Sequence, residues 1–171
     1  MRHQRLGVDW RPKETSMSFD LRHAVATLAY RAAKTLRDAP SGFSTFAPAP
    51  GSRTAGQILA HMGDLFDWAL SLANGQQVWN DTKPRDWESD VYRFFDALRQ
   101  FDERLASRAP LGCPEERLFQ GPIADALTHV GQLAMMRRLA GASIRGENYF
   151  KAEIAAGRVG VDQASPRREF D

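Results

Sequence analysis

The stretch GPIADALTHVGQLAMMRRLAG, residues 121–141, predicts a helix that carries its own start and stop signals. Pro122 suits the first position of a helix, where its missing N–H is no loss. Gly141 suits the left-handed cap beyond the end, and Arg137 and Arg138 stand where positive charge favours the C-terminal dipole. We therefore expect a helix of about five turns in this stretch.

Two polar residues of this helix, Asp125 and His129, are four positions apart and so lie roughly 40° apart on one face. Gln132 and Met136 continue the same stripe. The neighbouring arc is apolar and predicts a helix buried on most sides, through Ile123, Ala126, Leu127, Val130, Leu133 and Ala134. On a solvated face such a pair is a weak surface contact or, for Asp125, a favourable charge in the first turn. A buried carboxylate and imidazole need partners instead, and one metal ion would satisfy both.

Three more helices are predicted from apolar residues at helical spacing, over 18–36, 54–73 and 87–107. Proline-containing loops separate them at 43–53, 76–86 and 109–120. Phe43 and Phe46 of the first loop are expected to anchor on the bundle. Trp79 in the second loop and Trp87 at its end are too apolar for free solvent and are expected to cover part of the bundle.

Four helices with one broad apolar face each predict an all-α fold, a four-helix bundle with long loops and an irregular C-terminal tail. No sustained alternation of apolar and polar residues calls for a sheet. We divide the chain into an N-terminal extension, the bundle domain with its site, and the tail, at residues 1–17, 18–157 and 158–171. Met17 could be the natural start, because the helical pattern opens directly after it.

On the second predicted helix His61 falls at the inward edge of the apolar arc, with Asp64 nearer the boundary and Asp67 pointing away. A lone histidine in such a place is most simply a hydrogen-bonded core residue. The third helix offers no ligand on its inner face, and its polar residues are expected outside: Arg93, Asp96, Arg99, Asp102 and Glu103.

Metal sites in helix bundles are built from side chains on facing helices, and His61, Asp125 and His129 would supply two imidazoles and one carboxylate. This set suits one divalent ion, zinc or nickel first and iron(II) next, and three protein ligands leave coordination positions open. A structural zinc would close its shell with a fourth ligand, for which the candidates are Asp64, Gln57 and Gln132.

The run THVGQLAMMRRLAG, with AHMGDLFDW upstream, resembles the DinB/YfiT-like superfamily of metalloenzymes. Its hallmark is one histidine on the second helix and a histidine pair four apart on the last, just before an Arg-Gly-Gln. His61 matches the isolated histidine and His129 the second of the pair, followed here by Val-Gly-Gln. Asp125 departs from the commoner histidine, and a carboxylate there is similar to the arrangement in the mycothiol-dependent maleylpyruvate isomerases of the superfamily. The resemblance runs from Phe19 to Gly141, and GENYFKAEIAAGRVG in the tail is similar to one branch.

The resemblance implies a four-helix bundle of the DinB/YfiT type and a divalent-metal-dependent enzyme. Its characterised relatives bind and activate a small thiol for transfer or isomerisation, so the implied partners are a small-molecule thiol and an electrophile. A metal-dependent hydrolase is the first alternative, because a bound ion also lowers the pKa of water. A non-catalytic metal-binding stress-response protein is the second.

Composition excludes several other classes of protein. The 23 basic and 21 acidic residues of this 171-residue chain are scattered, which argues against a nucleic-acid partner. The single cysteine, Cys113, excludes an internal disulfide and a thiolate-rich zinc site, fits a cytoplasmic setting, and is expected to be structural. No apolar run follows the basic N-terminus or approaches membrane-spanning length, so we expect neither a signal peptide nor a membrane partner. The sequence leaves room for a homodimer.

Overall fold

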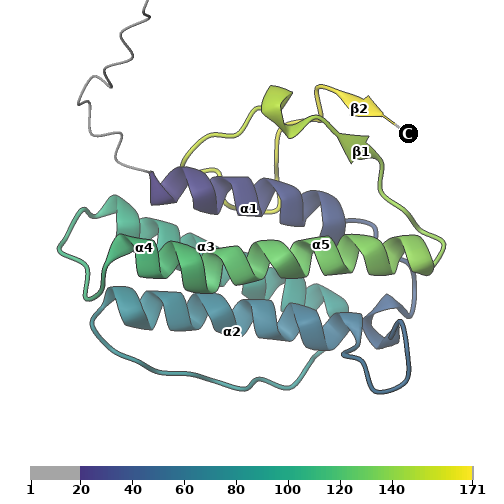
Figure 1. The fold of residues 1–171 in the computed structure, drawn as a ribbon, viewed down its shortest axis with the longest axis horizontal. Helices are drawn as coiled ribbons and strands as arrows, with labels where there is room; N and C mark the ends of the chain where they lie inside the picture. The colour runs from purple at the N-terminus through teal and green to yellow at the C-terminus, as the bar shows by residue number, and fades with distance from the viewer. Residues whose placement is uncertain (1–19, 171) are drawn as a thin grey trace, which may run out of the picture.

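Four long helices pack side by side in the computed structural model, which describes residues 20–170 (Figure 1). They are α1 Leu21–Leu36, α2 Ala55–Ala73, α3 Trp87–Ala106 and α5 Ala124–Leu139. The shorter elements are η1 Phe43–Thr45, α4 Glu115–Leu118, η2 Phe119–Ile123, β1 Gly146–Glu147, η3 Tyr149–Lys151 and β2 Glu169–Phe170. The chain is therefore mostly helical, as predicted, while the proposed extension at 1–17 lies outside the described residues. No helix in the described part of the chain has the length and apolar character needed to cross a membrane.

Side-chain caps fix where the first three long helices begin. Asp20 accepts a hydrogen bond from the backbone N–H of Arg22 at the start of α1. Thr54 and Gln57 form a reciprocal capping box at the start of α2, and Asp86 accepts from the N–H of Ser89 at the start of α3. These bonds satisfy backbone donors that a helix leaves unpaired at its N-terminus, so the predicted starts of α2 and α3 are confirmed to within a residue.

The core lies between the helices, where α2 packs along α3 and α5 lies against both α1 and α2. Its largest fully buried side chains include Phe66 of α2 and Phe94 and Phe101 of α3, whose rings are in contact. The loop before α2 contributes Phe43, which is buried and meets the Trp87 ring edge-on at 5.2 Å. The expected anchoring role of this loop is therefore confirmed.

The start of the last helix differs from the prediction. Helical structure begins at Glu115 in α4 and continues through the π-helical turn η2, which contains Pro122, into α5. Pro122 therefore does not occupy a first helical position, and 115–120 is not a loop. Proline removes a backbone donor and crowds the preceding turn, and the wider π turn accommodates both effects. The buried side chain of Leu118 holds this earlier start against the core.

Two polar residues of α3 that were predicted to face solvent instead bond residues of neighbouring helices. Asp102 is buried and accepts a bidentate pair of hydrogen bonds from Arg22 of α1, at 2.9 and 2.8 Å. Arg93 reaches across to α2, where it bonds Asp64 and Asp67. A helical wheel places such residues at the edge of the apolar arc but does not show which neighbouring charge covers them.

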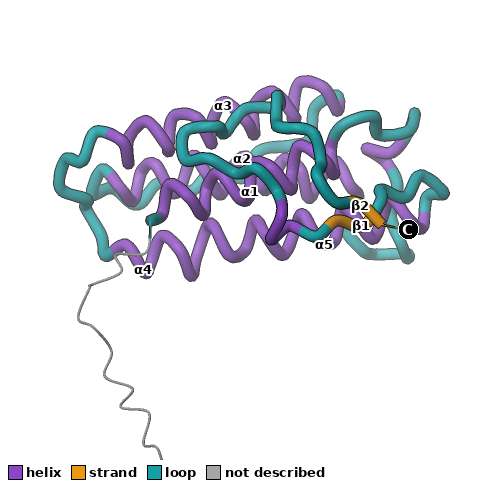
Figure 2. The backbone as a smooth tube through the Cα atoms, turned by 90° about the horizontal axis from the view of Figure 1, so that it is seen from above, coloured by secondary structure: helices purple, strands orange, loops and turns teal. Residues whose placement is uncertain are grey.

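The segment after α5 returns over α1, as the view from above shows (Figure 2). Its two short strands pair antiparallel, with Gly146 opposite Phe170 and Glu147 opposite Glu169, a small sheet that the sequence did not predict. Glu147 is buried and accepts hydrogen bonds from the hydroxyl of Tyr30 at 2.7 Å and from Lys34 at 2.9 Å. These bonds hold the segment onto α1.

Candidate metal centre

The three residues singled out in the sequence lie together in the structure. His61 comes from α2, and Asp125 and His129 come from the first half of the neighbouring α5. One ligand atom from each lies within 4.8 Å of the others, so the cluster could hold a metal ion.

The carboxylate of Asp125 lies between the two imidazoles. Its Oδ2 is 3.6 Å from Nε2 of His61, and its Oδ1 is 3.5 Å from Nε2 of His129. Both distances are too long for good hydrogen bonds, so the three groups do not satisfy one another. Ligand atoms around a tetrahedral zinc lie about 3.3–3.6 Å apart, which follows from metal–ligand distances of about 2.0–2.2 Å. The two spacings between Asp125 and the histidines therefore fit a shared ion better than they fit hydrogen bonds.

A hydrogen bond to Gln132, on the side of the ring away from Asp125, fixes the orientation of His129. Its Nδ1 lies 2.8 Å from Oε1 of Gln132, one turn further along α5. An amide oxygen only accepts, so Nδ1–H donates and the lone pair of Nε2 points toward Asp125. An outer hydrogen bond of this kind sets the tautomer of a metal-binding histidine. Gln132 is thus a partner of His129 rather than a fourth ligand.

The electrostatics of the cluster favour a neutral imidazole at His61. Burial lowers the pKa of His61 below its ordinary value, and the charge of Arg53 and the neighbouring imidazole of His129 act in the same direction. The charge of Asp125 opposes this shift without reversing it. Since only the neutral ring can bind a metal, the environment of His61 keeps it ready to do so near pH 7.

One side of the cluster is open. The side chain of Asp125 is 46% exposed, so the expectation that α5 is buried on most sides is only partly right. The reason is that the polar stripe runs along the outer edge of the packed face, where Gln132 is also exposed. A ligand from solution can therefore approach the carboxylate side.

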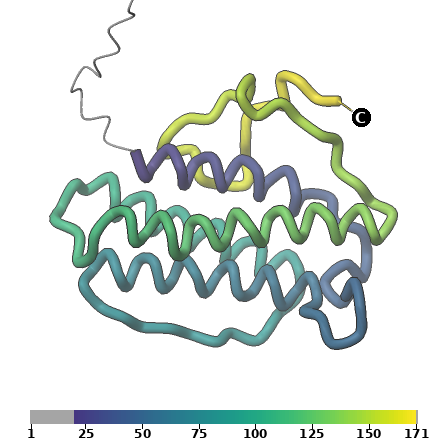
Figure 3. The backbone as a smooth tube through the Cα atoms, in the orientation of Figure 1, coloured from purple at the N-terminus to yellow at the C-terminus, as the bar shows by residue number. Residues whose placement is uncertain are grey.

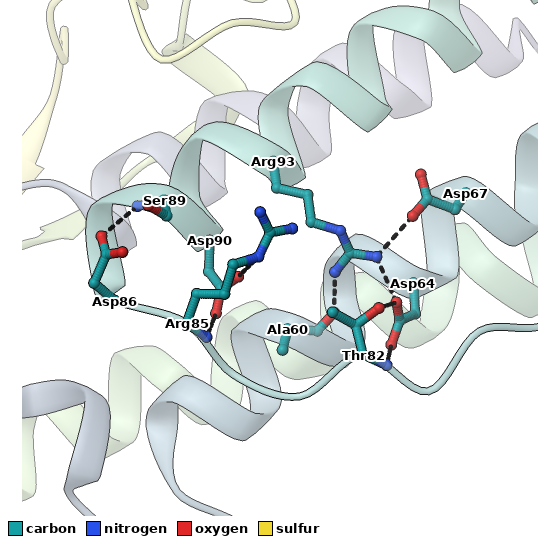
Figure 4. Close-up of polar contacts among 9 residues, drawn as sticks. All are labelled: Ala60, Asp64, Asp67, Thr82, Arg85, Asp86, Ser89, Asp90 and Arg93. Carbon is teal, nitrogen blue, oxygen red and sulfur yellow. Dashed lines mark hydrogen bonds and ion pairs between the residues drawn. The ribbon is translucent and has the colours of Figure 1, made fainter.

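The remaining candidates for a fourth ligand are occupied elsewhere. Asp64 is only 1% exposed, not at the boundary as expected. Its carboxylate accepts hydrogen bonds from the backbone N–H and hydroxyl of Thr82, at 2.9 and 2.6 Å, and from Arg93 (Figure 4). Gln57 is used in the cap of α2. The cluster therefore offers three protein ligands and an open side.

This Asp64 network, which the sequence analysis did not identify, fastens the connection between α2 and α3. The connection runs along the outside of α2, at the bottom of the view in Figure 3. At its far end the buried Asp90 accepts from the backbone N–H of Arg85 at 2.8 Å (Figure 4). A signal was present in the sequence, since Asp64 and Arg93 both lie near the edges of apolar arcs on two helices that follow each other in the chain.

The fastened connection brings an aromatic wall to the cluster. The Trp79 ring meets the ring of His61 edge-on at 5.5 Å and that of Trp68 at 5.8 Å. Trp79 therefore covers part of the bundle, as expected. The residue that it covers is His61, one of the candidate metal ligands.

Comparison of the chain with protein-family models gave no match, and neither curated proteins nor solved structures gave one.

Proposed function

We propose that the chain is a metal-dependent enzyme of the DinB/YfiT-like superfamily, with a bundle of that type, that transfers a small thiol to an electrophile. His61, Asp125 and His129 would hold one divalent ion, zinc or nickel first and iron(II) next. The observation that carries the proposal is the convergence of two imidazole nitrogens and a carboxylate within 4.8 Å, with one side open. The family resemblance of the residues around these ligands supports the same assignment.

The residues present suit such an ion. The donor set of two neutral nitrogens and one carboxylate is one that zinc, nickel and iron(II) accept. A bound divalent ion lowers the pKa of a coordinated thiol or water and so supplies a nucleophile at neutral pH. Trp79 and Trp68 provide an apolar wall beside His61, which would exclude water and leave a thiolate poorly solvated and reactive.

The sulfur would come from a cosubstrate rather than from the chain. Cys113 lies in the connection before α4, within a pocket that it shares with Leu21 and Leu105 and with none of the three ligands. Burial raises the pKa of its thiol, which lowers the fraction of reactive thiolate.

Metal-dependent hydrolysis is the second candidate, and the exposure of Asp125 favours it. The open side beside Asp125 leaves room for a water next to an ion that the three residues would hold, and such an ion would lower the pKa of that water. A non-catalytic metal-binding role in stress is the third reading, and it needs only the three ligands.

Metal binding is tested on protein purified without an affinity tag, because a tag could load nickel. We expect about one divalent ion per chain by elemental analysis, and added zinc should raise the stability of metal-free protein by about 2.7 kcal/mol at a hundredfold excess over Kd. His61→Ala, Asp125→Ala and His129→Ala should each abolish most of this gain. His23→Ala, an exposed histidine on α1, is the matched control and should keep it. The site would be refuted if the free energy of unfolding of wild-type protein were the same with and without zinc, nickel or iron(II).

The reaction is tested by incubating metal-loaded protein with bacillithiol, mycothiol, glutathione or cysteine and a panel of electrophiles. Thiol loss should be faster with wild-type protein than with His61→Ala. Equal rates of thiol loss with wild-type protein and His61→Ala across the panel would refute thiol transfer. Cleavage of an ester or amide without a thiol would indicate a hydrolase instead.

A further inference from the structure

Two pockets flank the candidate metal centre, and they share Arg53. The first, of about 430 Å³, is lined by Arg53 and His129 together with Ser52, Gln132 and several apolar side chains. The second, of about 290 Å³, is lined by Arg53 and His61 together with polar side chains, among them Lys83. Because each pocket takes one histidine of the cluster, a ligand in either would lie next to the metal ligands.

Part of the apolar surface of the first pocket is not packed into the core. Met136 and Ile58 contribute buried faces, and Met135 and Leu139 of α5 are 56% and 59% exposed. Large apolar side chains exposed together beside a pocket mark a binding surface more often than scattered ones do. Methionine side chains are flexible and polarisable, so they can fit an apolar chain of variable shape.

Arg53 supplies a positive charge at this pocket from a well-held backbone. The turn before it is closed by Ser52, whose hydroxyl donates to the carbonyl of Ala49 at 2.6 Å and accepts from its N–H at 3.1 Å. The capping box of α2 begins directly after it, at Thr54. Within residues 20–170 the guanidinium of Arg53 has no hydrogen bond or ion pair, so its donors are available to a ligand.

An arginine recognises a carboxylate through two parallel hydrogen bonds. We propose that the pocket of Arg53, Met135, Met136 and Leu139 binds a small amphiphilic carboxylate, with its charged group on Arg53 and its apolar chain on the two methionines and Leu139. This inference rests on the proposed function, because it takes the ligand of this pocket to be the electrophile of that reaction. The electrophile would then be an acid with an apolar body. Binding itself needs no metal, which allows the two to be tested apart.

The probe is octanoate, with 1-octanol as the uncharged compound of equal chain length and acetate as the charged compound without the chain. Full-length protein labelled at the methionine methyl groups is titrated in its metal-free and its zinc-treated form. The signals of Met135 and Met136 are assigned from Met135→Leu and Met136→Leu. We expect octanoate to shift both signals and to bind more tightly than 1-octanol or acetate.

Variants then separate the contribution of the ligand's charge from that of its apolar chain. Arg53→Gln should weaken octanoate binding about tenfold and leave 1-octanol unchanged, because one charged hydrogen-bond partner at an exposed site is lost. Leu139→Ser should weaken both. Arg138→Gln, which removes an exposed arginine of the same helix outside the pocket, is the control and should bind like wild-type protein.

The outcomes distinguish this inference from the proposed function. If octanoate binds metal-free protein and zinc does not bind at all, the pocket is supported and the metal centre is refuted. Zinc that binds while octanoate shifts neither methionine at millimolar concentration overturns the pocket. Equal affinity for octanoate and 1-octanol, or for wild-type protein and Arg53→Gln, overturns the carboxylate specificity.

Discussion

Replacing Asp64 with asparagine should lower the free energy of unfolding by about 3 kcal/mol. The carboxylate is 1% exposed, accepts two hydrogen bonds from Thr82 and bonds Arg93. Breaking a buried ion pair costs about 3–5 kcal/mol, because it leaves the other charge uncompensated. The lower end applies here, since Arg93 keeps its bonds to Asp67 and to the carbonyl of Ala60. In addition, the new amide keeps one oxygen that can accept from Thr82.

The measurement is urea unfolding of wild-type protein and Asp64→Asn, with Asp67→Asn as the matched control. Asp67 bonds the same guanidinium at 2.7 Å, but its side chain is 38% exposed. An exposed pair contributes about 0.2–1 kcal/mol, so the control should stay within that range.

A second readout follows the connection that Asp64 fastens. Release of Thr82 should speed proteolysis between residues 76 and 86 and change the fluorescence of Trp79. The reasoning is refuted if Asp64→Asn costs no more than Asp67→Asn, or if the connection is cleaved at the wild-type rate.

Three further predictions concern the cluster, the packing of α2 and the free cysteine. Asp125→Asn should lose most zinc affinity by calorimetry and Asp125→His should recover it; a residue that serves only the helix dipole would instead cost about 0.3–1 kcal/mol and leave affinity unchanged. Gly63→Ala should destabilise by about 1–3 kcal/mol in urea unfolding, because its Cβ would lie 2.6 Å from Nη1 of Arg93, whose guanidinium is held in place by Ala60, Asp64 and Asp67. Iodoacetamide should label Cys113 more slowly than a free cysteine at pH 8, with the rate rising at higher pH, because burial raises the pKa of the thiol and leaves little thiolate there.

The helices could be predicted because their causes are local. Thr54 and Asp86 stand directly before the runs of apolar spacing that become α2 and α3, and Gly141 has the positive φ of 76° that ends α5. Each of these signals acts within a few residues of its own position, so the sequence alone contains it.

The errors arose where the cause is distant in the chain. The charges of Asp64 and Asp102 are buried only because Arg93 and Arg22 approach from other helices. The helical stretch runs back through Pro122 because the buried Leu118 packs into the core, whereas the local rule for proline predicts a start. Helical spacing describes one helix at a time and does not give the register between two.

The same distinction applies to the candidate metal centre. The pairing of Asp125 with His129 follows from the spacing along one helix, but the approach of His61 depends on how far α2 and α5 are shifted along each other. That shift is set by packing along the whole interface, including the π turn η2 before α5. Periodicity placed His61 only on the inward edge of its helix, and its grouping with Asp125 and His129 was a hypothesis about facing helices; the structure does bring the three residues together.

The three ligands also differ in how firmly the fold holds them. His129 is oriented by Gln132, and His61 is covered by Trp79, whereas within residues 20–170 the carboxylate of Asp125 has only the two imidazoles as ion-pair partners. Asp125 is therefore the ligand whose rotamer an ion must fix, at a cost of about 0.5–1.5 kcal/mol for one immobilised side chain. Because this cost is small and the two imidazoles are already positioned, the cluster is close to the geometry that it needs to bind an ion.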